Sequence, residues 1–199
     1  MKNNIVAFFD YNCPFCYIGF SILEELKKQY DIQCVYKPFE LYPYITPGGM
    51  TKEELMKGYD IDNIFKKLRI IGKRNNITFG NLDIKYNSHK ALLLSQFAQD
   101  NNKFLGFSKI LYDNYYKLDK DISDENFLMN IFSSLNLNYE QAIAEIENGN
   151  LEKKFNESLN LKDTLNIGLL PTYIINEDSI LSGILTKRSF LKVLESYNK

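Results

Sequence analysis

The sequence predicts an α/β fold. A β-α-β unit at the N-terminus and a β-β-α unit at the C-terminus would build one sheet, with a large all-α segment inserted between them. Three observations predict it. Residues 5–9 are apolar at every position, as in a strand buried on both faces. Residues 42–166 show almost only helical periodicity. Strand patterns return only near residue 171, and neither outer part is large enough to fold alone.

The N-terminal unit reads as a strand, a helix and a second strand. After the first strand, apolar side chains recur at helical spacing over residues 15–30. Pro14 suits the first turn of that helix, where its missing N–H is not needed. Residues 31–41 (DIQCVYKPFEL) then read as a strand. Cys13 and Cys16 are therefore predicted at the strand-to-helix turn.

The central segment contains amphipathic helices with recognisable N-terminal caps. Residues 51–54 (TKEE) have the pattern of a capping box. Ser88, Ser123 and Asn138 each precede apolar residues at helical spacing. Gly149 suits the end of the helix that Asn138 begins.

The C-terminal unit reads as a hairpin followed by a helix. Residues 171–176 (PTYIIN) and 179–183 (SILSG) flank a turn at Glu177-Asp178, and Thr186 begins the last helix. The expected domains are a sheet-containing domain at residues 1–45 and 167–199 and an inserted α-helical domain at residues 46–166.

The composition argues against nucleic-acid and membrane partners. The net charge is −1, which is not the basic footprint of a nucleic-acid-binding protein. No apolar run is long enough to cross a bilayer. Only five apolar residues separate Asn4 from Asp10, fewer than the core of a secretory signal. We therefore expect a cytoplasmic protein.

Cys13 and Cys16 suit the chemistry of thiol–disulfide exchange. A thiol attacks only as a thiolate, and a helix N-terminus stabilises that anion with free N–H groups and partial positive charge. Cys13 is expected there as the exposed attacking thiol, and Cys16, one turn later, as the more buried resolving thiol. Pro14 and Phe15 between them shape the turn and therefore bear on the reduction potential.

Three other interpretations of the cysteine pair have to be weighed. Three cysteines in a reducing compartment do not make a structural disulfide framework. A zinc site needs two further ligands, for which only Cys34, on the apolar side of a strand, and His89, expected on a solvated first helical turn, are available. We therefore expect no metal. Deep burial would instead leave the pair inert, because it raises the pKa of a thiol.

Pro171 stands at the start of a strand that should run beside the first one. Proline in this position can simply begin the strand. It can also follow a cis peptide bond after Leu170, which a tight turn would hold in place. Such a turn beside the cysteine pair would expose the backbone of Leu170 for pairing with an extended client.

The segment DYNCPFCYIG (residues 10–19) resembles the D-x-x-C-P-W-C-Y-I-G motif of the FrnE-like branch of DsbA-like thioredoxin-fold proteins, with Phe15 where Trp is usual. Three further segments are similar to the family's, so the resemblance covers nearly the whole chain. They are residues 37–49 (KPFELYPYITPGG), 86–98 (YNSHKALLLSQFA) and 169–175 (LLPTYII).

The resemblance implies a thioredoxin-like fold with an inserted all-α domain, in which Cys13 is the nucleophile and Cys16 its partner. It also implies that Pro171 is a cis-proline, with Leu170 and Thr172 beside it at the substrate-binding edge. The implied enzyme exchanges disulfides with client proteins or small thiols. It requires no metal or organic cofactor, although glutathione or a partner reductase could recycle the pair.

Two alternative functions stand beside this one. The same branch of the fold includes 2-hydroxychromene-2-carboxylate isomerases and kappa-class glutathione transferases, which usually have Ser at the position of Cys13. A glutathione-dependent isomerase or transferase is therefore the first alternative. The second is a non-catalytic binding protein or chaperone with an idle cysteine pair. Because both Cys13 and Cys16 are present, a thiol–disulfide oxidoreductase is favoured.

Overall fold

The predicted β-α-β unit opens the fold. The structure is a computed structural model that describes residues 2–183 and 185–197. Strand β1 (Asn3–Phe9) is followed by helix α1 (Pro14–Leu26) and strand β2 (Ile32–Pro38), and the two strands pair in parallel. Both faces of β1 are covered in its second half, which explains its unbroken run of apolar residues.

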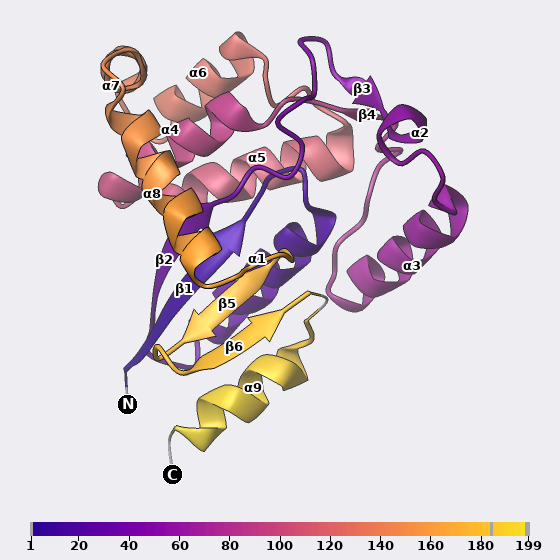
Figure 1. Cartoon of the computed structure of the whole chain (residues 1–199), viewed down its shortest axis with the longest axis vertical. Helices are drawn as coiled ribbons and strands as arrows, with labels where there is room; N and C mark the ends of the chain where they lie inside the picture. Colours follow the sequence, from indigo (N-terminus) through magenta and orange to yellow (C-terminus); the bar gives the residue numbers. More distant parts are fainter. Residues whose placement is uncertain (1, 184, 198–199) are drawn as a thin grey trace.

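The C-terminal hairpin completes a four-stranded sheet with the order β2-β1-β5-β6. Strand β5 (Thr172–Ile175) runs antiparallel to β1 and to β6 (Ser179–Ser182). Helix α9 (Lys187–Ser196) follows, capped by Thr186 as predicted. The hairpin and the last helix therefore confirm the predicted β-β-α unit (Figure 1).

The central segment is mainly helical, as predicted (Figure 1). Its helices are α2 (Lys52–Leu55), α3 (Ile61–Arg74), α4 (His89–Asp100), α5 (Phe104–Leu118), α6 (Glu125–Ser134), α7 (Tyr139–Glu147) and α8 (Asn150–Thr164). No helix in the described part of the chain has the length and apolar character needed to cross a membrane.

A second, two-stranded sheet was not predicted. Strands β3 (Met50–Thr51) and β4 (Ile84–Lys85) pair antiparallel within the central segment. Two-residue strands are too short to show an alternating pattern, so helical signals dominate this part of the sequence. The small sheet matters for the site because it holds Lys85.

Two of the predicted helix caps need correction. Thr51 forms the predicted capping box, in which its side chain accepts the N–H of Glu54. The side chain of Ser88 makes no cap hydrogen bond at the start of α4 and donates to Asp10 instead. The cap of α6 is Asp124 and not its neighbour Ser123, because the Asp124 carboxylate accepts the N–H of Phe127, the third residue of the helix.

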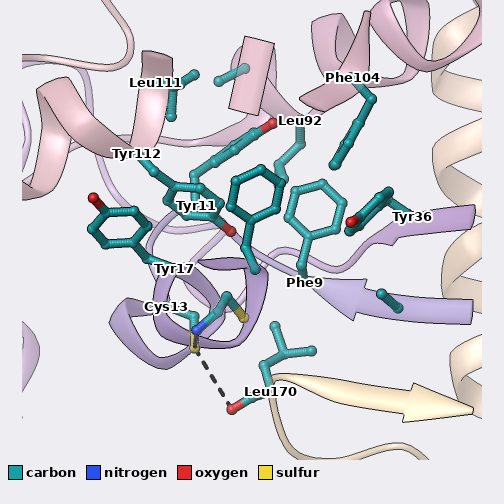
Figure 2. Packing of buried hydrophobic residues seen from close by; sticks show 14 of the residues in the cluster. Phe9, Tyr11, Cys13, Tyr17, Tyr36, Leu92, Phe104, Leu111, Tyr112 and Leu170 are labelled. Carbon is teal, nitrogen blue, oxygen red and sulfur yellow. Dashed lines mark hydrogen bonds between the residues drawn. The ribbon is translucent and has the colours of Figure 1, made fainter. Parts of the chain in front are cut away.

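Aromatic rings connect the sheet and α1 to the helical segment (Figure 2). The ring of Tyr17 on α1 stacks on Tyr112 and Tyr116 of α5, with centroids 5.2 Å and 5.6 Å apart. Phe9 of β1 meets Phe104 of α5 edge to face, at 5.4 Å. Because one buried apolar cluster includes side chains from both segments, the division into two domains stays a prediction.

Candidate active site

Cys13 lies at the N-terminus of α1, where the sequence places it. It is the N-cap residue, and its Sγ accepts the N–H of Cys16 at 3.3 Å. Pro14 occupies the first helical turn and lacks an N–H, so the free donors of that turn come from later residues. The helix therefore directs both a backbone donor and the positive end of its dipole at the Cys13 sulfur.

The expectation that Cys13 is exposed is wrong. Its exposed fraction is 4%, against 2% for Cys16, so both thiols are buried. The Cys13 side chain lines a cavity of about 250 Å³, walled by Pro14, Phe15, Tyr42 and Leu170 among others. The loops after β2 and before β5 cover the strand-to-helix turn that carries Cys13. Local sequence patterns do not predict this burial.

The segment before β5 contacts the cysteine pair directly. The Leu170–Pro171 peptide bond is cis, as predicted. The Cys13 thiol donates to the Leu170 carbonyl oxygen, with 3.7 Å between sulfur and oxygen (Figure 2). The Thr172 hydroxyl donates to the Leu169 carbonyl at 2.7 Å, so it braces the turn and does not line the cavity.

Cys16 is the more deeply placed of the two thiols. It lies on the first turn of α1 behind Cys13, and neither thiol is in a disulfide. Burial raises the pKa of Cys16 well above its ordinary value, and the neighbouring Cys13 adds to that effect. Cys16 is therefore held as a neutral thiol near neutral pH.

Asp10 is a site residue that the sequence analysis did not single out. It is fully buried, and its carboxylate accepts the N–H of Asn12 at 3.0 Å, the hydroxyl of Ser88 at 2.8 Å and the N–H of Leu41 at 2.7 Å. Its backbone carbonyl accepts the N–H of Cys13. Burial raises the pKa of Asp10 to about 6. Asp10 thus connects the active-site turn to the loop after β2 and to the residue before α4.

Lys85 on β4 is a second residue that was missed. Its exposed fraction is 5%, and it lines the cavity that Cys13 also lines. The Nζ atom lies 5.3 Å and 5.2 Å from the ring centroids of Tyr115 and Tyr116. Among the described residues it has no hydrogen-bond partner. Burial lowers the pKa of Lys85 to about 8.

His89 lies on the first turn of α4, as expected, and contacts two acidic side chains there. Its side chain is 35% exposed and lies between Glu40 Oε2, at 3.1 Å from Nδ1, and Glu152 Oε1, at 2.8 Å from Nε2. The hydrogen bond to Glu40 is the main cause that raises the pKa of His89 to about 9. No group of three or more His, Cys, Asp or Glu side chains in residues 2–183 and 185–197 could hold a metal ion.

The His89 ion pairs predict a pH-dependent contribution to stability. A histidine whose pKa rises on folding stabilises the fold fully below its unfolded value of 6.5, and the contribution disappears as pH rises through about 9. We therefore expect His89→Gln to lower the free energy of unfolding more at about pH 6 than at about pH 9.5, as measured by urea denaturation. An equal effect at both pH values would contradict this assignment.

Solved structures of similar fold include oxidoreductases and an isomerase. The probable DsbA oxidoreductase SCO1869 from Streptomyces coelicolor superposes with a TM-score of 0.85 at 14% identity, covering 98% of this chain and 89% of that one. The cytosolic disulfide reductase DsbM from Pseudomonas aeruginosa, solved with GSH, gives 0.72 at 14% identity, with 97% and 99% covered. A 2-hydroxychromene-2-carboxylate isomerase gives 0.76 at 15% identity, with 98% and 93% covered. At these identities the likeness shows the fold alone.

Sequence comparison gives the family. The uncharacterized protein YwbO of Bacillus subtilis (strain 168) is 24% identical over 204 aligned positions, which cover 100% of this chain and 99% of that protein. The family described as DSBA-like thioredoxin domain matches residues 4–194. This match includes the cysteine turn, the helical segment and the strand after Pro171. The chain therefore belongs to the family of DSBA-like thioredoxin domains.

Proposed function

We propose that this protein is a thiol–disulfide oxidoreductase in which Cys13 attacks a disulfide and Cys16 resolves the mixed disulfide. The placement of the Cys13 sulfur carries the proposal. It lies at the N-terminus of α1, 3.3 Å from the Cys16 amide nitrogen and 3.7 Å from the Leu170 carbonyl oxygen. The N-terminus of the helix stabilises the thiolate form of a sulfur in this position. The sulfur also lies beside a backbone segment with which an extended client could pair.

The proposed cycle moves two electrons from the cysteine pair to a substrate disulfide. The Cys13 thiolate attacks one substrate sulfur, the substrate S–S bond breaks, and the departing sulfur takes up a proton. Cys16 then loses its proton and attacks Cys13 Sγ. The Cys13–Cys16 disulfide forms as the second substrate thiol leaves. The reverse sequence oxidises a client dithiol and returns the pair to its reduced form.

Client proteins or small thiols are the proposed partners. The apolar side chain of Leu169, 64% exposed, borders the backbone edge beside Cys13 and offers a surface for an extended client. The cycle uses no metal or organic cofactor, and we propose glutathione or a partner reductase as the recycling agent. A cytoplasmic setting would supply both.

Reduction of insulin by dithiothreitol tests the proposal. We expect the protein to accelerate insulin precipitation, and Cys13→Ala to return the rate to that of dithiothreitol alone, because the attacking sulfur is gone. Cys34→Ala is the matched control, since it removes the remaining cysteine, which lies on β2. Equal rates for the parent protein and Cys13→Ala would refute the mechanism.

A glutathione-dependent isomerase is the second candidate, favoured by the similar fold of the 2-hydroxychromene-2-carboxylate isomerase. This function needs one group at the position of Cys13 and gives Cys16 no chemical role. Isomerase turnover that depends on added glutathione and survives Cys16→Ala would establish it in place of disulfide exchange.

A further inference from the structure

The burial of Cys13 raises a question about its charge. A thiolate removed from water is disfavoured unless a nearby charge or hydrogen bond compensates for the lost hydration. The Cys16 N–H supplies one hydrogen bond from the side of the helix. With Cys13 only 4% exposed, the cavity side of the sulfur meets little water. A positive group in the cavity wall would therefore have a large effect on this thiol.

Lys85 is a positive group in that wall. It is 5% exposed, and its ammonium nitrogen has no hydrogen-bond partner among the residues that the structure describes. A buried charge without a counter-ion is costly to the fold. The faces of Tyr115 and Tyr116 cover one side of the ammonium group, which offsets only part of that cost.

The fixed anions near Lys85 already have other partners. The Asp10 carboxylate accepts three hydrogen bonds, none of them from Lys85. Asp119 accepts the N–H groups of Asn81 and Leu82.

Four charged neighbours act on the ammonium group from the surrounding elements. The negative charges of Cys13, Asp10 and Asp119 raise the pKa of Lys85, whereas burial, the largest effect, and Lys52 lower it. Of Cys13, Asp10 and Asp119, Cys13 is the residue that lines the same cavity as Lys85.

We propose that Lys85 is a positioning residue for Cys13: its ammonium group, in the wall of the cavity that Cys13 lines, is the buried counter-charge that stabilises the Cys13 thiolate. This inference rests on the proposed function. When Cys13 stays a thiolate, reduction of the Cys13–Cys16 disulfide takes up two electrons and one proton. Stabilising that product raises the reduction potential of the pair, and this favours oxidation of client dithiols.

The pH dependence of Cys13 alkylation tests the inference. A Cys16→Ala, Cys34→Ala background leaves Cys13 as the single thiol for iodoacetamide. In that background we expect Lys85→Met to move the midpoint of the rate profile upward by about one pH unit, which makes alkylation about tenfold slower at a pH below both midpoints. Lys85→Arg, which keeps the charge, should restore most of the rate. Lys73→Met removes one exposed charge on α3 and should leave the profile unmoved.

If Lys85→Met does not fold, the effect of Cys13 on the titration of Lys85 can be measured instead. Coupling between two sites acts equally in both directions. In protein with ¹⁵N-labelled lysine, Cys13→Ser removes the thiolate and should lower the pKa of Lys85 that is observed by NMR. An unchanged lysine titration would overturn the inference.

The redox equilibrium with glutathione separates the inference from the proposed function. In the otherwise unchanged chain, Lys85→Met should shift the equilibrium about tenfold toward the Cys13–Cys16 disulfide, and Lys73→Met should not shift it. If Lys85→Met changes neither the equilibrium nor the alkylation profile while insulin reduction still depends on Cys13, the role of Lys85 is refuted and the proposed function stands. Insulin reduction that survives Cys13→Ala overturns the proposed function itself.

Discussion

Replacement of Cys16 by alanine is expected to convert the protein from a catalyst into a trap. Cys13 would still attack a substrate disulfide, but the mixed disulfide would accumulate because the thiol that resolves it is missing. We expect multiple turnover of insulin to fall at least about tenfold, which corresponds to about 1.4 kcal/mol of activation free energy. Mass spectrometry under non-reducing conditions should find the substrate attached to Cys13.

The geometry behind this expectation is the position of Cys16 on α1. Cys16 is 2% exposed and does not line the cavity that Cys13 lines, so a substrate that enters this cavity meets Cys13 and not Cys16. Burial raises the pKa of Cys16 well above its ordinary value, which keeps it protonated and prevents it from competing with Cys13 for substrate.

Controls make the trapping experiment specific. The Cys13→Ala, Cys16→Ala double variant should form no adduct, and Cys34→Ala in the Cys16→Ala background should trap as much substrate as before. Turnover equal to that of the parent protein, or an adduct on Cys34, would show that Cys16 is not the resolving thiol.

The part of the site that the sequence predicted depends on strand topology. A cysteine pair directly after β1 must lie at the carboxyl end of that strand. Strand β5 runs antiparallel to β1, so its first residues lie at the same end, with Thr172 opposite Phe8. The unbroken apolar run at residues 5–9 identifies the first strand and the hairpin pattern identifies the second, which Pro171 immediately precedes. The cysteine pair and Pro171 therefore lie close together because their strands are neighbours, and the sequence patterns of these strands predict that arrangement.

The residues that were missed share a different property. Asp10 lies at the end of a strand and Lys85 in a two-residue strand, where a charged side chain is normally solvated. Their burial comes from segments far away in the sequence, such as Leu41 above Asp10 and Tyr115 beneath Lys85. Such packing leaves no periodic signal, and the same holds for the loops that cover Cys13.

Asp10→Ala is expected to cause the largest loss of stability among the variants considered. The substitution leaves the N–H groups of Asn12 and Leu41 and the hydroxyl of Ser88 without their acceptor in a buried site. An unsatisfied buried donor costs about 1–3 kcal/mol, and removal of the buried carboxylate offsets part of the total. We expect the free energy of unfolding to fall by about 2–4 kcal/mol in urea denaturation at about pH 7.

An exposed carboxylate provides the matched control for this loss. Asp31→Ala removes an exposed carboxylate from the loop before β2 and should change the free energy of unfolding by less than about 0.5 kcal/mol. A loss of the same size in both variants would show that the hydrogen bonds of Asp10 do not account for the effect.

The titration of Asp10 gives this prediction a second, independent test. Burial raises its pKa from 3.8 in the unfolded chain to about 6, so the folded state holds the proton more tightly. The resulting stabilisation is fully present below pH 3.8 and is lost as pH rises through about 6. A shift of this size corresponds to about 3 kcal/mol. The amide in Asp10→Asn does not titrate, so the stability of this variant does not contain the pH-dependent contribution of the carboxyl group.

The stability of the parent protein relative to Asp10→Asn should therefore decrease by about 3 kcal/mol between about pH 4 and about pH 7, and stay constant at higher pH. The amide keeps the size of the carboxyl group but replaces one acceptor oxygen with an NH2 donor, so the comparison uses the change with pH, in which this constant difference cancels. A relative stability that rises with pH would mean that Asp10 is better stabilised as an anion than its burial implies. In that case a positive group would be acting on the carboxylate, and Lys85, whose pKa Asp10 raises, would be the candidate.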